Sequence, residues 1–151
     1  MIPLDNQTYE IITKISDRME FLFDHEQRPI PVIEINKFKL DCLKLIQDKC
    51  PDIAKDGISV SFAYCEGHAN AKDLENARVK CWTYIHKKYD IDDNKSKEVC
   101  MVKAVIGALH SELNSYEVYD SISFFTGMMI RSGVSGSTIR KYLTEHFKQF
   151  F

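Results

Sequence analysis

The side chains best suited to metal or nucleophile chemistry in this chain are its five histidines and five cysteines. Zinc sites use such ligands at short, fixed spacings, as in His-Glu-x-x-His or Cys-x-x-Cys, and neither pattern occurs. Asp24-His25-Glu26 could hold a metal, but a polar cluster at a predicted helix end is more typical of a solvated surface. Cys65 and His68 are close in sequence, whereas catalytic thiol–imidazole pairs usually meet only in space. We therefore predict no metal site, no cofactor and no nucleophile.

Paired carboxylates for acid–base catalysis would have to come from Asp90, Asp92 and Asp93. A carboxylic acid that donates a proton near neutral pH needs burial, which raises its pKa. These three residues lie in a polar segment that is predicted to be a solvated turn. We predict that the protein is not an enzyme, and the alternative is an enzyme whose site is assembled from residues distant in sequence.

The cysteines, at positions 42, 50, 65, 81 and 100, are odd in number and widely spaced, which argues against a disulfide framework. Cys42, Cys81 and Cys100 fall within apolar helical patterns, where a free thiol packs as a small hydrophobe. The N-terminus has no basic segment followed by an apolar one, and no run of 18 uncharged apolar residues occurs. We expect a cytoplasmic protein with reduced cysteines and no membrane association.

Apolar residues recur at spacings of three and four along most of the chain, which indicates helices. With 151 residues, 44% of them apolar, the chain has the size and core material of one domain over residues 1–151. Residues 58–65 also alternate as in a strand, but no partner strand is evident, so we predict a helix there. The expected fold is all-α, a compact single-domain bundle of about seven helices. The apolar stripes span residues 11–22, 35–46, 58–65, 74–85, 99–113, 118–129 and 139–150.

A helix–turn–helix pattern occupies residues 125–144, with Gly133 and Ser135 in the turn. It resembles the DNA-binding motif of bacterial repressors, a resemblance that would place Arg140 and Lys141 against DNA. Met129 stands where that family usually has alanine, and the net charge of −2 lacks the basic excess of a nucleic-acid footprint. We favour an ordinary corner between two helices, in which glycine and serine serve turn geometry and capping. A DNA-binding regulator is the alternative function.

A longer pattern begins with Ala77-Arg78 and Cys81-Trp82 in the predicted helix at 73–85. An acidic turn at 90–93, an apolar helix at 102–109 and an aromatic helix at 123–129 follow it. This order resembles small helical immunity proteins of bacterial toxin systems, including contact-dependent growth inhibition and other polymorphic toxins. In the same helix, Trp82 stands beside Cys81 on the apolar stripe of Leu74, Ala77 and Ile85. We expect it to be buried between helices, with truncation to alanine costing about 3–5 kcal/mol.

The resemblance implies a protein that binds a cognate toxin, such as a nuclease, with fixed stoichiometry and needs no catalytic residue. A small acidic excess suits a basic partner, and residues 1–70 carry a net charge of −4. The expected protein-binding residues are acidic side chains, for which the structural alternative is a solvated rim. They are Asp73, Glu75, Asp90, Asp92 and Asp93.

Overall fold

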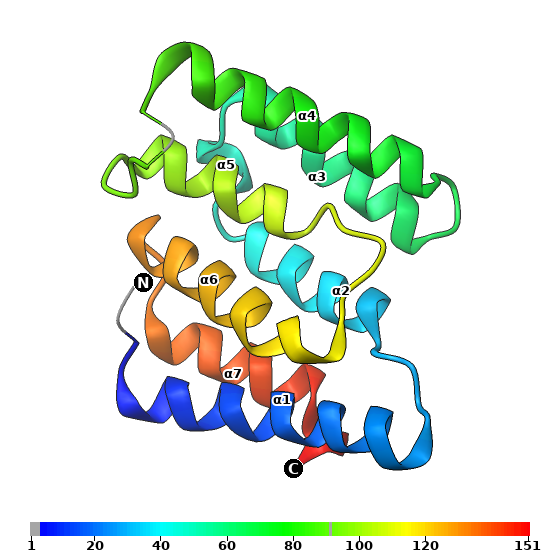
Figure 1. Ribbon diagram of the computed structural model, residues 1–151. Coiled ribbons are helices and arrows are strands. Elements are labelled where there is room, and N and C mark those ends of the chain that lie inside the picture. The colour runs from blue at the N-terminus through cyan, green and yellow to red at the C-terminus, as the bar shows by residue number, and fades with distance from the viewer. Residues whose placement is uncertain (1–3, 91) are drawn as a thin grey trace.

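The computed structural model describes residues 4–90 and 92–151 (Figure 1). Seven α-helices and three short 3-10 helices account for its regular structure, and no strand occurs in these residues. The all-α prediction is confirmed, including the helix over residues 58–65. The helices are α1 Asn6–Glu26, α2 Val32–Leu43, α3 Asp52–Cys65, α4 Ala71–Lys88, α5 Lys97–Gly107, α6 Val118–Arg131 and α7 Gly136–His146. The 3-10 helices are η1 Gln47–Lys49, η2 Ser115–Glu117 and η3 Lys148–Phe150.

Short polar side chains start four of the helices. The carboxylate of Asp5 accepts the backbone N–H of Thr8 at 2.8 Å and caps α1. Asn70 caps α4 in a reciprocal capping box, while Ser96 and Ser135 cap α5 and α7. Each cap satisfies a backbone N–H that has no partner within its helix, so the sequence itself fixes where these helices begin.

The helices are stacked so that α4 and α1 lie at opposite edges of the molecule (Figure 1). The pair α3–α4 packs on α5 and α2, and the group α6, α7 and α1 completes the other end. One continuous core joins the two groups, with side chains such as Ile35, Phe38 and Phe125 fully enclosed. Helix α4 packs on α3 and α5 at one edge of the molecule, so its outer surface faces solvent.

Helix α5 ends at Gly107, earlier than the apolar stripe to residue 113 predicted. Side chains from three other helices donate hydrogen bonds to the backbone carbonyls that follow Gly107. Ser61 donates to the carbonyl of Ala108 at 2.6 Å, Asn36 donates to that of His110 at 2.9 Å, and Arg78 donates to that of Leu109. These contacts replace the bonds that a longer helix would have made, and so they fix an extended connection between α5 and α6. None of the helices in the described residues is long and apolar enough to cross a membrane.

Candidate functional site

The predicted acidic residues occupy the two ends of α4 and do not form one patch. Asp73 and Glu75 lie in its first turns, while Asp90, Asp92 and Asp93 follow its C-terminus. A helix rises 1.5 Å per residue, so the two groups are on the order of 25 Å apart. A single small partner surface could contact one group or the other, but only a large one could span both.

Most of these carboxylates have local partners. The Asp73 carboxylate accepts the backbone N–H of Asn70 in the capping box, and Glu75 forms an ion pair with Lys72 at 3.3 Å. The Asp90 carboxylate accepts the N–H of Asp92.

The Asp93 carboxylate accepts two backbone N–H groups, from Lys95 at 2.8 Å and from Ser96 at 3.2 Å. Those hydrogen bonds hold the pKa of Asp93 below its usual value. Asp92 is exposed, and within the described residues its carboxylate has no hydrogen-bond partner. Asp92 is therefore the carboxylate of the turn with the most freedom to meet a partner.

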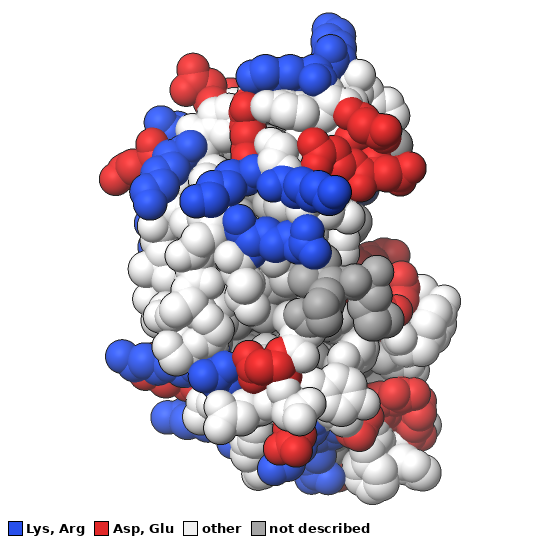
Figure 2. Space-filling view, turned by 90° about the vertical axis from the view of Figure 1, so that its left-hand side faces the viewer, with Lys and Arg blue, Asp and Glu red and all other residues white. Residues whose placement is uncertain are grey.

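Basic side chains anchor the turn between α4 and α5. The ammonium of Lys103 donates to the carbonyl of Asp93 at 3.1 Å and to the amide oxygen of Asn94 at 2.7 Å. Arg131 of α6 donates to the carbonyl of Asn94 at 2.7 Å. Figure 2 shows the face on which this turn lies, and basic side chains gather across its upper half with acidic ones beside them. The surroundings of the turn are thus of mixed charge.

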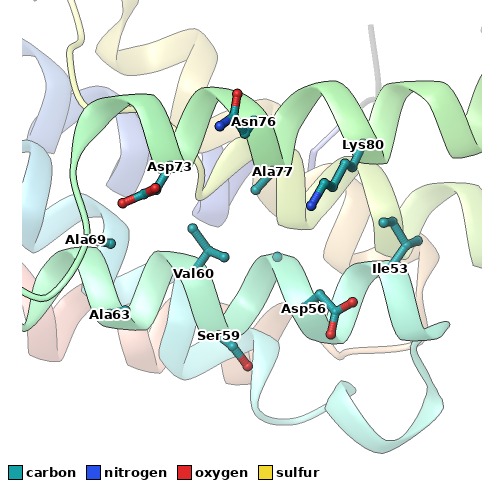
Figure 3. Close-up of a pocket in the computed structure, with 11 residues that line it drawn as sticks. Ile53, Asp56, Ser59, Val60, Ala63, Ala69, Asp73, Asn76, Ala77 and Lys80 are labelled. Atoms are coloured by element: carbon teal, nitrogen blue, oxygen red, sulfur yellow. The ribbon is translucent and has the colours of Figure 1, made fainter.

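A groove of about 370 Å³ lies between α3 and α4 (Figure 3). Its walls are mostly small or short side chains, such as Gly57, Ala63 and Ala77, which leave open space between two helices that otherwise pack closely. In Figure 3, Val60 points into the gap from α3, Lys80 reaches toward α3 from α4, and Asp73 points toward the end near Ala69. Asp56 contributes a second carboxylate on the α3 side.

The charged groups of the groove come from both of its walls. It contains two carboxylates and one ammonium, and no histidine or cysteine lines it. No group of three His, Cys, Asp or Glu side chains with metal-ligand geometry occurs in residues 4–90 and 92–151. Of its charged residues, only Asp73 was predicted. Asp56 and Lys80 come from different helices, and nothing in their sequence spacing signals that they share a groove.

The prediction that Trp82 is buried between helices is wrong, because its ring is only partly buried. Leu74, Ala77, Cys81 and Ile85 form the buried stripe of α4. Trp82 follows Cys81 directly, and one residue turns a helix by about 100°, which rotates the indole off the stripe. The ring instead lines a second hollow of about 360 Å³, together with Ile106 of α5 and Phe124 of α6.

The segment 125–144 forms a corner between α6 and α7. Gly133 has a φ of +105°, and Ser135 caps α7, so both residues have the geometric roles expected of them. Arg140 donates to the Asp5 carboxylate at 3.0 Å and to the Thr8 hydroxyl at 3.1 Å, which ties α7 to the start of α1. In this structure Arg140 thus holds two helices together.

Comparisons with protein-family models, with curated proteins and with solved structures found no match to this chain.

Proposed function

We propose that the protein is a cytoplasmic immunity protein that binds a cognate bacterial toxin, such as a nuclease, and neutralises it by stoichiometric protein–protein interaction. The groove between α3 and α4 carries the proposal. It lies beside α4 at one edge of the molecule, is open to solvent, and combines an apolar lining with two carboxylates and one ammonium. Such a hollow accepts a protruding side chain of a partner and can pair with a basic one.

The architecture suits an inhibitor because binding requires a rigid surface and no catalytic group. The helix that borders the groove, α4, begins in a capping box, and its buried stripe fixes it to α3 and α5. A surface held in one conformation loses little entropy when a partner docks, which favours tight complexes. Residues 73–85, whose order resembles the signature helix of immunity proteins, belong to this same helix.

The test is neutralisation of the protein encoded immediately upstream of this gene. We expect co-expression to restore growth to cells that produce that protein, and calorimetry to show a complex of fixed stoichiometry. Failure to bind or to protect would overturn the proposal.

Paired variants of α4 locate the surface. Asn76 is exposed and lines the groove, so Asn76→Arg should fill it with bulk and positive charge and weaken binding at least about tenfold. Val79 is exposed on the same helix but does not line the groove, and Val79→Arg makes the same charge change. Equal loss in both variants, or loss only in Val79→Arg, would contradict the assignment of the groove.

A further inference from the structure

A third hollow, of about 370 Å³, lies between α1 and the segment formed by η2 and the first turn of α6. Three tyrosines line it, Tyr9 from α1 and Tyr116 and Tyr119 from the segment after the α5–α6 connection. Asp17 and Glu20 of α1 are its charged lining residues. The site thus combines three aromatic rings and two carboxylates from segments about 100 residues apart in sequence.

Two of the three rings are in contact, and two of the three are largely exposed to solvent, while Tyr119 is partly buried. The rings of Tyr9 and Tyr119 meet edge to face, with centroids 5.9 Å apart. Tyr9 is 51% exposed and Tyr116 is 73% exposed. Tyrosines held in a hollow yet exposed to water are typical of surfaces that bury them on association, where tyrosine is enriched among the residues that dominate affinity.

The charge of the hollow has one sign. No lysine or arginine lines it, and neither Asp17 nor Glu20 forms an ion pair within the described residues. The faces of tyrosine rings attract cations, and a carboxylate nearby adds to that attraction. The hollow is therefore complementary to a positive charge carried on an apolar stem.

Thr13 also lines the hollow, and its hydroxyl oxygen is buried without a hydrogen-bond partner in the described part of the chain. On this wall of the hollow, α1 therefore contributes Thr13 in addition to its two carboxylates.

We propose that this hollow receives the guanidinium or ammonium group of an arginine or lysine side chain presented by a protein partner. The identity of the partner rests on the proposed function, in which it is the toxin. The binding of the cationic group itself does not. The rings supply the walls, and Asp17 and Glu20 supply the compensating charge.

The binding step can be tested with a small probe. Acetyl-arginine amide would be titrated into ¹⁵N-labelled protein, with acetyl-citrulline amide as the neutral match of the same shape. We expect saturable shifts of backbone signals from residues 9–20 and 115–120 with the arginine probe only. The double variant Asp17→Asn/Glu20→Gln removes the two charges that attract the guanidinium, so it should weaken binding of the arginine probe by about fivefold or more, which is about 1 kcal/mol.

A matched control separates the hollow from net charge. Asp24→Asn/Asp48→Asn removes the same two charges at exposed positions outside the hollow and should bind the probe as the parent does. Equal binding of the citrulline probe would overturn the proposal. So would an equal loss of arginine binding in both double variants.

An assay with the toxin distinguishes this inference from the proposed function. If the upstream-encoded protein is neutralised equally well by the parent and by Asp17→Asn/Glu20→Gln, the hollow is not a docking site, although the immunity function stands. If the arginine probe binds as expected but no toxin is bound, the cation site stands and the immunity function fails.

Discussion

The ammonium of Lys39 lies 2.9 Å from the carbonyl oxygen of Gly107, inside the core. Lys39 belongs to α2 and is only 2% exposed, and its ammonium also donates to the hydroxyl of Ser121 at 2.6 Å. The Phe125 ring lies 5.8 Å from the same nitrogen. One buried cation thus connects α2 to the end of α5 and to the first turns of α6.

Lys39 should make the stability of the fold depend on pH. Burial lowers the pKa of Lys39 from 10.5 to about 7, because the charged form loses its hydration. Between these two values the unfolded chain binds more protons than the folded one, so the free energy of unfolding rises with pH in this window. For one group the slope is on the order of 1 kcal/mol per pH unit, and the contribution is constant below pH 7.

Urea denaturation of the parent and of Lys39→Met at pH 6, 7.5 and 9 would measure this effect. We expect the stability difference between the two to shift steadily in favour of the parent between pH 7 and pH 9. Methionine keeps most of the length of the side chain without a charge, so titrating groups that do not interact with Lys39 cancel in the difference. A difference that does not change with pH would mean that the Lys39 ammonium is hydrated.

A second prediction concerns Gly57 of α3, which lies against α5. A Cβ at this position would sit 2.7 Å from Cγ1 of Val105, closer than real contacts allow. Val105 is fully buried and stiff about its χ1 torsion, so it cannot move aside cheaply. We expect Gly57→Ala to lower stability by about 1–3 kcal/mol, despite the better helix propensity of alanine.

Two companion variants test the cause of that loss. A Cβ added at Gly107 would lie 3.8 Å from the Phe125 ring, which is an ordinary contact distance. Gly107→Ala should therefore be neutral or slightly stabilising. Val105→Ala removes the clashing methyl, and the double variant with Gly57→Ala should then lose less than the sum of the single losses. Additive losses in thermal melts would show that the two positions do not touch.

The sequence predicted the helices well because their signals are local. Apolar residues three and four apart and polar N-caps such as Ser135 can both be read within one segment. The end of α5 was not readable in this way. It depends on Asn36, Ser61 and Arg78, which donate to carbonyls between 31 and 74 residues away in sequence.

The candidate sites show the same division. That Asp73 and Asp90 lie far apart follows from the helical rise alone, once the residues between them are known to form one helix. The meeting of Tyr9 with Tyr119, or of Asp56 with Lys80 in one groove, depends on how helices pack. Such pairs leave no spacing pattern, so a single sequence cannot reveal them.

A third prediction concerns Trp82 and replaces the cost of truncation that was expected for a buried ring. Because only part of the indole is removed from water, Trp82→Ala should cost about 1–2 kcal/mol, well below the loss for a fully buried tryptophan. It is the only tryptophan in the chain, so its emission reports on the hollow formed with Ile106 and Phe124. We expect native fluorescence that acrylamide quenches readily. A melting temperature that collapses in Trp82→Ala would restore the buried assignment.

The last prediction separates an inhibitor from a DNA-binding protein at the corner of α6 and α7. Arg140 forms an ion pair with Asp5 and also reaches Thr8, so Arg140→Ala should destabilise the contact between α1 and α7 by about 1 kcal/mol. Lys141 is exposed in the same turn and forms no ion pair within the described residues, so Lys141→Ala should leave stability unchanged.

If this corner read DNA, both variants should weaken binding, and affinity should fall steeply with salt as counterions are released. We expect no sequence-specific binding by the parent at about 0.15 M salt, where charges are screened beyond about 8 Å. Selection from a random duplex library, followed by fluorescence anisotropy, would measure it. Tight binding to one selected duplex that Lys141→Ala abolishes without loss of stability would establish a regulator, because only a lost DNA contact could then explain the defect.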